Sequence, residues 1–325
     1  MPSGHARARP TSNHTPTTVI VPDMRGNLVS VKDAGGLSRW AARAIEQVRT
    51  VAVGGGVDRS LRVTLNFHPD RGTGRASVLT HLAGEGVYRC QFETGSSNGG
   101  LTAHPGGDRW LWEQRIFGHA YDDAPACERP KYGALNHRRR RIGGAPRFGS
   151  AHLRLNEPVL DRTTFCFPDS VLQPRDLGTA DRFDLIRLAD AFDAIPRSES
   201  DERVVAGALD DYIEAHVHGV VRIDRDVEAL VLDPSYRDTV IEEQAQLLGT
   251  PVEWHEGRTL TVADLAAHPH YRGHHVIDVG RRIARDGVLD AFVIGQAVLT
   301  GHEDPQDLKK VWHHVARFGT SAAIT

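Results

Sequence analysis

Apolar and polar residues alternate along four short segments of the chain, which predicts β-strands that bury one face. The four segments are residues 61–68, 87–93, 148–155 and 211–219. In the last segment, Glu214, His216 and His218 share one face, and the apolar residues Ile213, Ala215 and Val217 share the other. If the strands form one sheet, its polar face is rich in His, Glu, Gln, Asn and Arg, as the floor of a polar cleft would be. An amphipathic sheet without a site would show the same alternation.

Spacings close to 3.6 residues predict helices around these strands. The predicted helices are residues 37–50, 110–117, 180–195, 202–209, 227–232, 235–248, 262–267, 276–285, 289–299 and 307–318. Residues 94–150 are otherwise expected to be irregular, with loops at 95–100 and 128–136.

The order of these elements predicts an α+β fold. We expect residues 37–225 to form a mixed or antiparallel sheet domain that has one polar cleft face and holds the active site. Residues 226–325 are expected to form a helical C-terminal region packed on it. Residues 1–18 offer little to bury and predict a disordered tail.

The composition adds no new element to this prediction, but it argues against several classes of protein. The chain has 325 residues, a net charge of −3 and 40% hydrophobic residues, as in an ordinary soluble protein. No apolar run reaches the roughly 20 residues of a membrane span, and the N-terminus lacks the apolar core of a secretory signal. One basic run, residues 137–141, does not support a nucleic-acid partner. Three separated cysteines favour reduced thiols, so we expect a cytoplasmic protein without a membrane partner.

Five segments resemble a bacterial family of unknown function that is common in actinobacteria. They read LNFHPDR from Leu65, QFETG with SNGG from Gln91, ERPKYGALN from Glu128, FGSAHLRL from Phe148 and YIEAHVHG from Tyr212. The resemblance spans roughly residues 40–320 and implies no established activity.

A more distant resemblance is to ADP-ribosyltransferase-like folds, which place a His or Arg, an aromatic residue or Ser, and a Glu on successive strands. His68 or Arg71, then Tyr132, and then Glu214 follow that order. The resemblance implies a transferase that uses NAD as its substrate. Glu214 would be the catalytic carboxylate, His68 the anchor for ribose or diphosphate, and Tyr132 the stacking partner of nicotinamide. The chain departs from these folds in lacking a Ser-Thr-Ser strand and a Glu-x-Glu pair.

The remaining polar residues of these segments are candidates for binding the nucleotide. These cofactor-binding candidates are Arg71, Gln91, Glu93, Ser97, Asn98, Arg129, Lys131, Asn136, His152 and His216. We expect the cations Arg71, Arg129 and Lys131 to neutralise phosphate. The expected partner is a small-molecule nucleotide, and the sequence does not indicate the macromolecular acceptor.

Two other functions fit the same residues. A metal-dependent hydrolase or oxygenase would bind Zn or Fe through His216 and His218, completed by His68, His152 or Glu93. A binding module would hold a nucleotide or a peptide without turnover. All three functions share one geometric expectation: the polar side chains of the four predicted strands should converge on one pocket.

Overall fold

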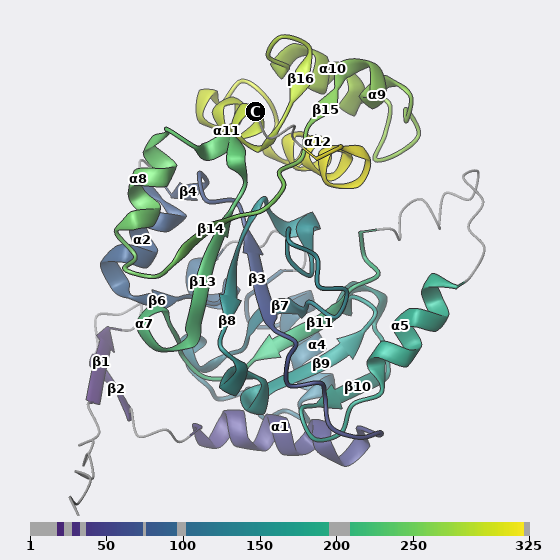
Figure 1. Cartoon of the computed structure of the whole chain (residues 1–325). Helices are drawn as coiled ribbons and strands as arrows, with labels where there is room; N and C mark the ends of the chain where they lie inside the picture. Colours follow the sequence, from purple (N-terminus) through teal and green to yellow (C-terminus); the bar gives the residue numbers. More distant parts are fainter. Residues whose placement is uncertain are drawn as a thin grey trace, which may run out of the picture.

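An eight-stranded sheet forms the centre of the molecule (Figure 1). The computed structural model describes residues 18–22, 28–32, 37–73, 76–95, 102–194 and 209–321. In spatial order the strands are β10 (Asp176–Thr179), β9 (Thr163–Phe167), β11 (Ile213–Val217), β7 (Lys131–Leu135), β3 (Val63–Phe67), β8 (Ala151–Leu155), β13 (Val227–Leu232) and β14 (Val252–Trp254). Neighbours are antiparallel except β13 and β14, which are parallel. The expected α+β fold with a mixed sheet is confirmed.

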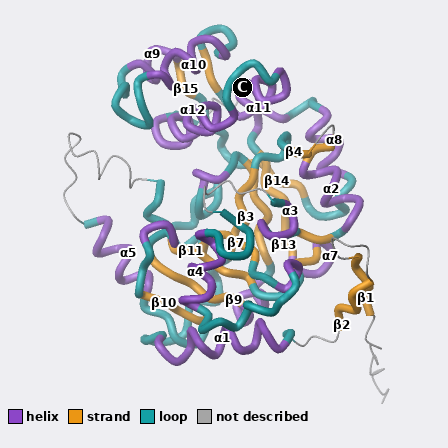
Figure 2. The backbone as a smooth tube through the Cα atoms, turned by 180° about the vertical axis from the view of Figure 1, so that it is seen from behind, coloured by secondary structure: helices purple, strands orange, loops and turns teal. Residues whose placement is uncertain are grey.

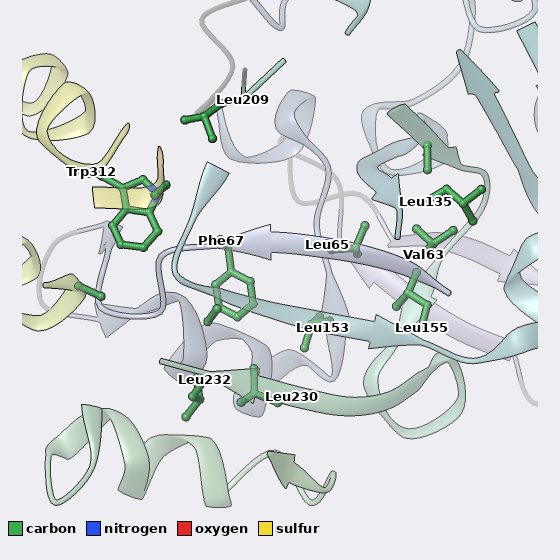
Figure 3. Close-up of a cluster of buried hydrophobic side chains, with 14 of the residues drawn as sticks. Val63, Leu65, Phe67, Leu135, Leu153, Leu155, Leu209, Leu230, Leu232 and Trp312 are labelled. Carbon is green, nitrogen blue, oxygen red and sulfur yellow. The ribbon is translucent and has the colours of Figure 1, made fainter. Parts of the chain in front are cut away.

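One face of the sheet is built from the alternating apolar residues. Along β3, Val63, Leu65 and Phe67 enter the main hydrophobic core, where Leu153 of β8 and Leu230 of β13 join them (Figure 3). The polar residues Thr64 and Asn66 between them are buried as well. The sheet is therefore covered on both faces, and its polar face lies inside the protein.

Helices lie on both faces of the sheet (Figure 2). The helices are α1 (Arg39–Val51), α2 (Val78–Glu85), α3 (Gln91–Thr94), α4 (Asp108–Ile116), α5 (Leu185–Asp193), α7 (Ile223–Asp226), α8 (Val240–Gln246), α9 (Val262–Ala266), α10 (His275–Ile283), α11 (Ala291–Thr300) and α12 (Pro305–Phe318). Residues of α1 and α4 cluster around Cys166 of β9, whereas α5 packs with its neighbour Phe165. Because successive strand residues point to opposite faces, α1 and α4 cover the polar face and α5 the apolar one.

The other strands form short antiparallel pairs outside the central sheet. These pairs are β1 (Thr18–Pro22) with β2 (Leu28–Lys32), β4 (Gly72–Thr73) with β5 (Ala76–Ser77), β6 (Val87–Tyr88) with β12 (Val221–Arg222), and β15 (Leu260–Thr261) with β16 (Val288–Leu289). Among the described helices, none is both long and apolar enough to cross a lipid bilayer.

The C-terminal region is helical from α8 onward, apart from the short strands β14, β15 and β16, and α9 to α12 lie beyond one end of the sheet (Figure 1). The helix expected at 227–232 is wrong, because this segment is β13. The run Val-Glu-Ala-Leu-Val-Leu is buried along nearly its whole length between β8 and β14. A six-residue run with five apolar residues fits a buried strand as well as a helix, so periodicity alone does not separate the two. The sheet thus extends past residue 226.

The strand expected at 87–93 is wrong beyond Tyr88, where the chain turns into α3. The carboxylate of Glu93 accepts a hydrogen bond of 2.8 Å from the backbone N–H of Cys90, which begins the helix. Gly95 then ends it in a left-handed conformation with φ of 64°. These two local signals outweigh the alternation of the segment.

The loop expected at 128–136 is also wrong, because residues 131–135 form β7 in the middle of the sheet. Lys-Tyr-Gly-Ala-Leu has no β-branched residue, so its strand propensity is low. Gly133 is nevertheless required there. A Cβ atom at this position would lie 2.5 Å from Cδ2 of Leu65 and 2.5 Å from the carbonyl oxygen of Thr64. The glycine allows close approach of the two strands.

Three expectations fall on residues outside the described ranges. They concern the tail at residues 1–18, of which Thr18 alone is described, nearly all of the helix at 202–209, and the loop that carries Ser97 and Asn98.

Candidate active site on the polar face of the sheet

Glu214 is the centre of the polar face. It lies on β11 directly between Ala134 of β7 and Cys166 of β9. Two residues further on, His216 lies between Tyr132 and Thr164 of the same strands. The sheet register therefore brings Tyr132, Glu214 and His216 close together, although 84 positions separate the first from the last.

Both oxygens of Glu214 have several hydrogen-bond partners. Oε2 accepts from the backbone N–H of Ser170 at 3.1 Å, from its hydroxyl at 2.9 Å and from the Tyr212 hydroxyl at 3.3 Å. Oε1 lies 3.1 Å from Nε2 of His216 and 3.5 Å from Nη1 of Arg109. Burial acts to raise the pKa of Glu214, but His216, Arg109 and the Ser170 N–H lower it to about 2. The site therefore holds a buried, ionised carboxylate.

A second carboxylate is linked to Glu214 through Tyr212. The Tyr212 hydroxyl donates to Asp169 as well as to Glu214. Burial and the negative charge of Glu214 raise the pKa of Asp169 to about 6. Asp169 also caps the short turn that begins at Ser170, accepting from the Val171 N–H at 2.7 Å. The Asp169 side chain thus fixes the turn in which Ser170 lies beside Glu214.

Glu113 of α4 supports Tyr132 from below. Its carboxylate accepts a hydrogen bond of 2.8 Å from the Tyr132 hydroxyl and forms a buried ion pair with Arg129. The Arg129 guanidinium also lies 3.9 Å from the centre of the Trp110 ring and donates to the carbonyl oxygen of Tyr121. Arg129 therefore holds α4 and β7 together below the pocket.

A pocket of about 500 Å³ opens above these groups. Seven of the expected site residues line it: His68, Arg71, Gln91, Glu93, Lys131, Tyr132 and Glu214. They come from the end of β3, from α3, and from β7 and β11, which are segments far apart in the sequence. Arg89 and Arg109 add positive charge to the wall. This volume is within the range of small-molecule sites.

Four other expected site residues are described but do not line the pocket. They are Arg129, Asn136, His152 and His216. Asn136 closes a turn, donating to the carbonyl oxygen of Arg140 at 2.8 Å. His152 lies on the polar face opposite Asn66, but the backbone at Gly143 covers it so closely that a Cβ atom there would lie 3.0 Å from its Nδ1. The four polar segments therefore converge only in part.

His216 and His218 lie below the floor of the pocket. Nδ1 of His216 and Nε2 of His218 both approach the Thr164 hydroxyl, at 3.1 Å and 3.0 Å. The other nitrogen of His218 lies 2.6 Å from the Tyr121 hydroxyl. Both rings are thus hydrogen-bonded inside the protein, and His216 also contacts Glu214 directly.

One set of residues in the described part of the chain has the spacing of a metal site. Its ligand atoms, from Cys166, Glu214 and His216, lie within 4.8 Å of one another. Burial and the charge of Glu214 hold the pKa of the Cys166 thiol well above its usual range, so it disfavours the thiolate that metals bind. The set includes His216 but none of the other ligands expected for Zn or Fe.

Several residues of the site are not among those expected from the sequence. Tyr212 carried a usable signal, because it shares the strand face of Glu214 two positions earlier. Arg109 and Glu113 lie on a helix inside a segment of low periodicity, and Ser170 lies in a turn. Their positions in the site depend on tertiary packing that no local pattern encodes.

The fold and the pocket define an α+β protein with a small-molecule pocket on the inner, polar face of its sheet. Residues 62–198 and 193–318 match the family described as "Protein of unknown function (DUF3626)". The match covers more than half of the chain, so the chain belongs to this family, and the expectation of a family of unknown function is confirmed. No curated protein matches the chain.

Proposed function

We propose that the protein is an enzyme that cleaves the bond between nicotinamide and ribose in NAD and transfers the ADP-ribosyl group to an acceptor. One observation carries the proposal: His68, Tyr132 and Glu214 line a single pocket. Tyr132 and Glu214 belong to β7 and β11, and His68 directly follows β3; these three strands are adjacent in the sheet. Their order along the chain is the order that ADP-ribosyltransferase-like folds use.

Glu214 has the properties that the reaction needs. As the glycosidic C–N bond breaks, its electron pair leaves with nicotinamide, and the ribose carbon gains oxocarbenium character. A carboxylate that is already ionised and held in place stabilises that charge without reorganising. The donors from Ser170, Tyr212 and His216 keep Glu214 in this state. An acceptor nucleophile then bonds to the ribose carbon and loses its proton.

Tyr132 is the proposed stacking partner of the nicotinamide ring, and Arg109 affects that role. The Arg109 guanidinium lies 3.9 Å from the centre of the Tyr132 ring. The nicotinamide ring of NAD is itself a cation before the bond breaks, so two positive groups compete for one aromatic face. We therefore propose that Arg109 moves off the ring when NAD binds.

The phosphates of NAD would lie near the basic part of the wall. Arg71 reaches the pocket from the turn after β3, and its buried Nη2 has no hydrogen-bond partner among the described residues. Lys131 lines the same pocket, although its amino group also donates to the carbonyl oxygen of Cys127 at 2.7 Å. Both cations suit a diphosphate.

Release of nicotinamide from NAD tests the proposal. We expect the wild-type protein to release it and Glu214→Gln to lose at least about 100-fold in rate, because a neutral amide cannot stabilise the developing charge. Glu85→Gln is the matched control, since Glu85 also lines the pocket but pairs with Arg89 at its rim. Equal thermal midpoints would show that both variants are folded.

Two results contradict the proposal. Full activity of Glu214→Gln would remove the assigned role of this carboxylate. Binding of NAD without nicotinamide release would make the protein a nucleotide-binding module instead. Addition of candidate acceptors, compared with hydrolysis by water, would then identify the class of acceptor.

A further inference from the structure

Basic side chains from distant segments meet where the turn after β3 faces α12. They are Arg71 in that turn, Arg147 in the short helix Pro146–Phe148, Arg272 in the loop before α10 and Lys309 on α12. Asp210 pairs with Arg147 and lies 3.9 Å from Arg272, and the charges of all three arginines act on Lys309.

Two contacts of Trp312 fix α12 against this part of the sheet. Its ring nitrogen donates to the carbonyl oxygen of Pro146 at 2.8 Å, and its ring meets the His68 ring edge-on at 5.2 Å. Trp312 is fully buried (Figure 3). The basic groups are therefore held by packed elements of the fold, and they adjoin the pocket that His68 and Arg71 line.

His313 supplies an observation independent of the charges. Its side chain is buried, and neither ring nitrogen has a hydrogen-bond partner within the described ranges. Burial, with the charges of Arg272 and Arg147, holds the pKa of His313 well below its usual range, so the ring is neutral and carries one N–H. A buried donor of this kind calls for an acceptor.

The arginines also have unused donors. Nε of Arg147 and Nε of Arg272 are buried and have no hydrogen-bond partner in the part of the chain that the structure describes. Three carboxylates offset part of the charge. Asp210 pairs with Arg147 and lies 3.9 Å from Arg272, Asp169 lies 3.6 Å from Arg147, and the charge of Asp70 acts on Arg71. The four basic groups still outnumber them. Burial and the surrounding arginines lower the pKa of Lys309 to about 8.

The backbone at Arg272 is also unusual. Its φ of 60° lies in the left-handed region, which disfavours residues with a Cβ atom, and Gly273 follows with φ of 104°. Such a conformation persists where the surroundings require it, and it clusters at ligand-binding segments.

We infer that this cluster binds a phosphate group, held by Arg71, Arg147, Arg272, Lys309 and the N–H of His313. A phosphate offers oxygens in several directions and accepts paired hydrogen bonds from guanidinium groups, which suits donors that converge from four segments. The inference goes beyond the proposed function, because it holds whether or not NAD is the ligand of the pocket.

Binding of inorganic phosphate to the full chain tests the inference. We expect phosphate to raise the thermal midpoint in a saturable manner, compared with chloride at equal ionic strength. Lys309→Gln should weaken binding about tenfold, and Lys309→Arg should restore most of it. The matched control is Lys310→Gln, because the neighbouring Lys310 forms a surface ion pair with Asp307 and should leave the affinity unchanged. The midpoint of each variant in chloride shows that it is folded.

Absence of a phosphate effect beyond that of chloride would overturn the inference, as would equal affinities for Lys309→Gln and Lys310→Gln. Titration with phosphate in the presence of NAD distinguishes two sources of the phosphate group. Competition assigns the site to a phosphate of the ligand in the pocket. Simultaneous binding assigns it to a phosphate on a second ligand. Nicotinamide release is measured separately, so failure of this site leaves the test of Glu214 intact.

Discussion

Arg109 stacks its guanidinium on the ring of Tyr132, with 3.9 Å between the guanidinium carbon and the ring centre. The same group donates to the Ser170 hydroxyl at 2.8 Å and lies 3.5 Å from an oxygen of Glu214. One buried cation thus contacts both the aromatic and the acidic side of the proposed site. A substitution of Arg109 should therefore change the pKa of Glu214.

We expect Arg109→Gln to shift the acid limb of the pH profile of kcat/KM for NAD. The positive charge of Arg109 helps to lower the pKa of Glu214, so removing it raises that pKa. Glu214 would then become protonated at a higher pH, and the acid limb should move up by about 1 pH unit. The profile is measured by nicotinamide release from pH 7 down to about pH 1.5, because the acid limb of the wild type follows a pKa of about 2.

Arg115→Gln is the control for this experiment. Arg115 lies on the same helix but is exposed, and it donates to Gln173 at 2.9 Å. Its replacement should leave the acid limb in place. An unshifted limb in Arg109→Gln would show that the charge of Arg109 does not tune the reactive carboxylate.

Asp70 gives a prediction about stability and pH. Its carboxyl accepts a hydrogen bond of 2.9 Å from Tyr236, but burial raises its pKa from 3.8 to about 6. Between these values the folded protein holds a proton that the unfolded chain has released, so this group makes folding less favourable as pH rises through that window. Asp70→Asn cannot ionise and should lack the effect. We expect the stability of the variant relative to wild type to increase between pH 4 and pH 7.5 by on the order of 2–3 kcal/mol.

Chemical denaturation at several pH values measures this difference. Asp278→Asn serves as the control, because Asp278 pairs with Arg281 at an exposed surface. If the free energy of unfolding depends on pH in the same way in Asp70→Asn and in the wild type, the Asp70 carboxyl does not cause the loss of stability.

The sequence was sufficient for strands whose apolar and polar residues alternate cleanly. β3, β8 and β11 fall within the predicted segments for that reason. Patterns failed where another interaction decided the structure. Strand β7 depends on the fit of Gly133 against Leu65, and β13 is buried too completely to alternate.

The residues of the candidate site also differ in how far the sequence indicates them. Glu214 could be found from the sequence because the face that it shares with His216 is a property of one strand. The sequence indicates Tyr132 only through the resemblance to ADP-ribosyltransferase-like folds, because the pattern of its own segment predicts a loop. Arg109 could not be found in this way, because its contact with Glu214 joins residues 105 positions apart.

The cluster of Cys166, Glu214 and His216 leads to a prediction about metal. A cation at Glu214 would have to displace the donors from Ser170 and Tyr212 that already occupy its oxygens. We therefore expect dialysis against a chelator to leave nicotinamide release unchanged, and elemental analysis of untagged protein to find no stoichiometric Zn or Fe. Loss of activity with chelator, restored by one metal, would favour the metal-dependent function instead.

Two glycine substitutions test the close packing that forms the floor of the pocket. Gly133→Ala places a Cβ atom 2.5 Å from both Cδ2 of Leu65 and the carbonyl oxygen of Thr64, and the backbone oxygen cannot turn aside. We expect a loss of about 1–3 kcal/mol in the free energy of unfolding, because β7 must move away from β3. Movement of β7 would also displace Tyr132, so the affinity for NAD should fall.

Gly84→Ala is the matched control in a helix. Gly84 is exposed in α2, and an added Cβ atom would meet nothing within 4 Å. Alanine favours helix over glycine by roughly 1 kcal/mol, so this variant should be slightly more stable than wild type. The two substitutions add the same methyl group and are expected to change the free energy of unfolding in opposite directions. Equal effects of both substitutions in urea denaturation would contradict the tight contact between β3 and β7, and with it the placement of Tyr132 beside Glu214.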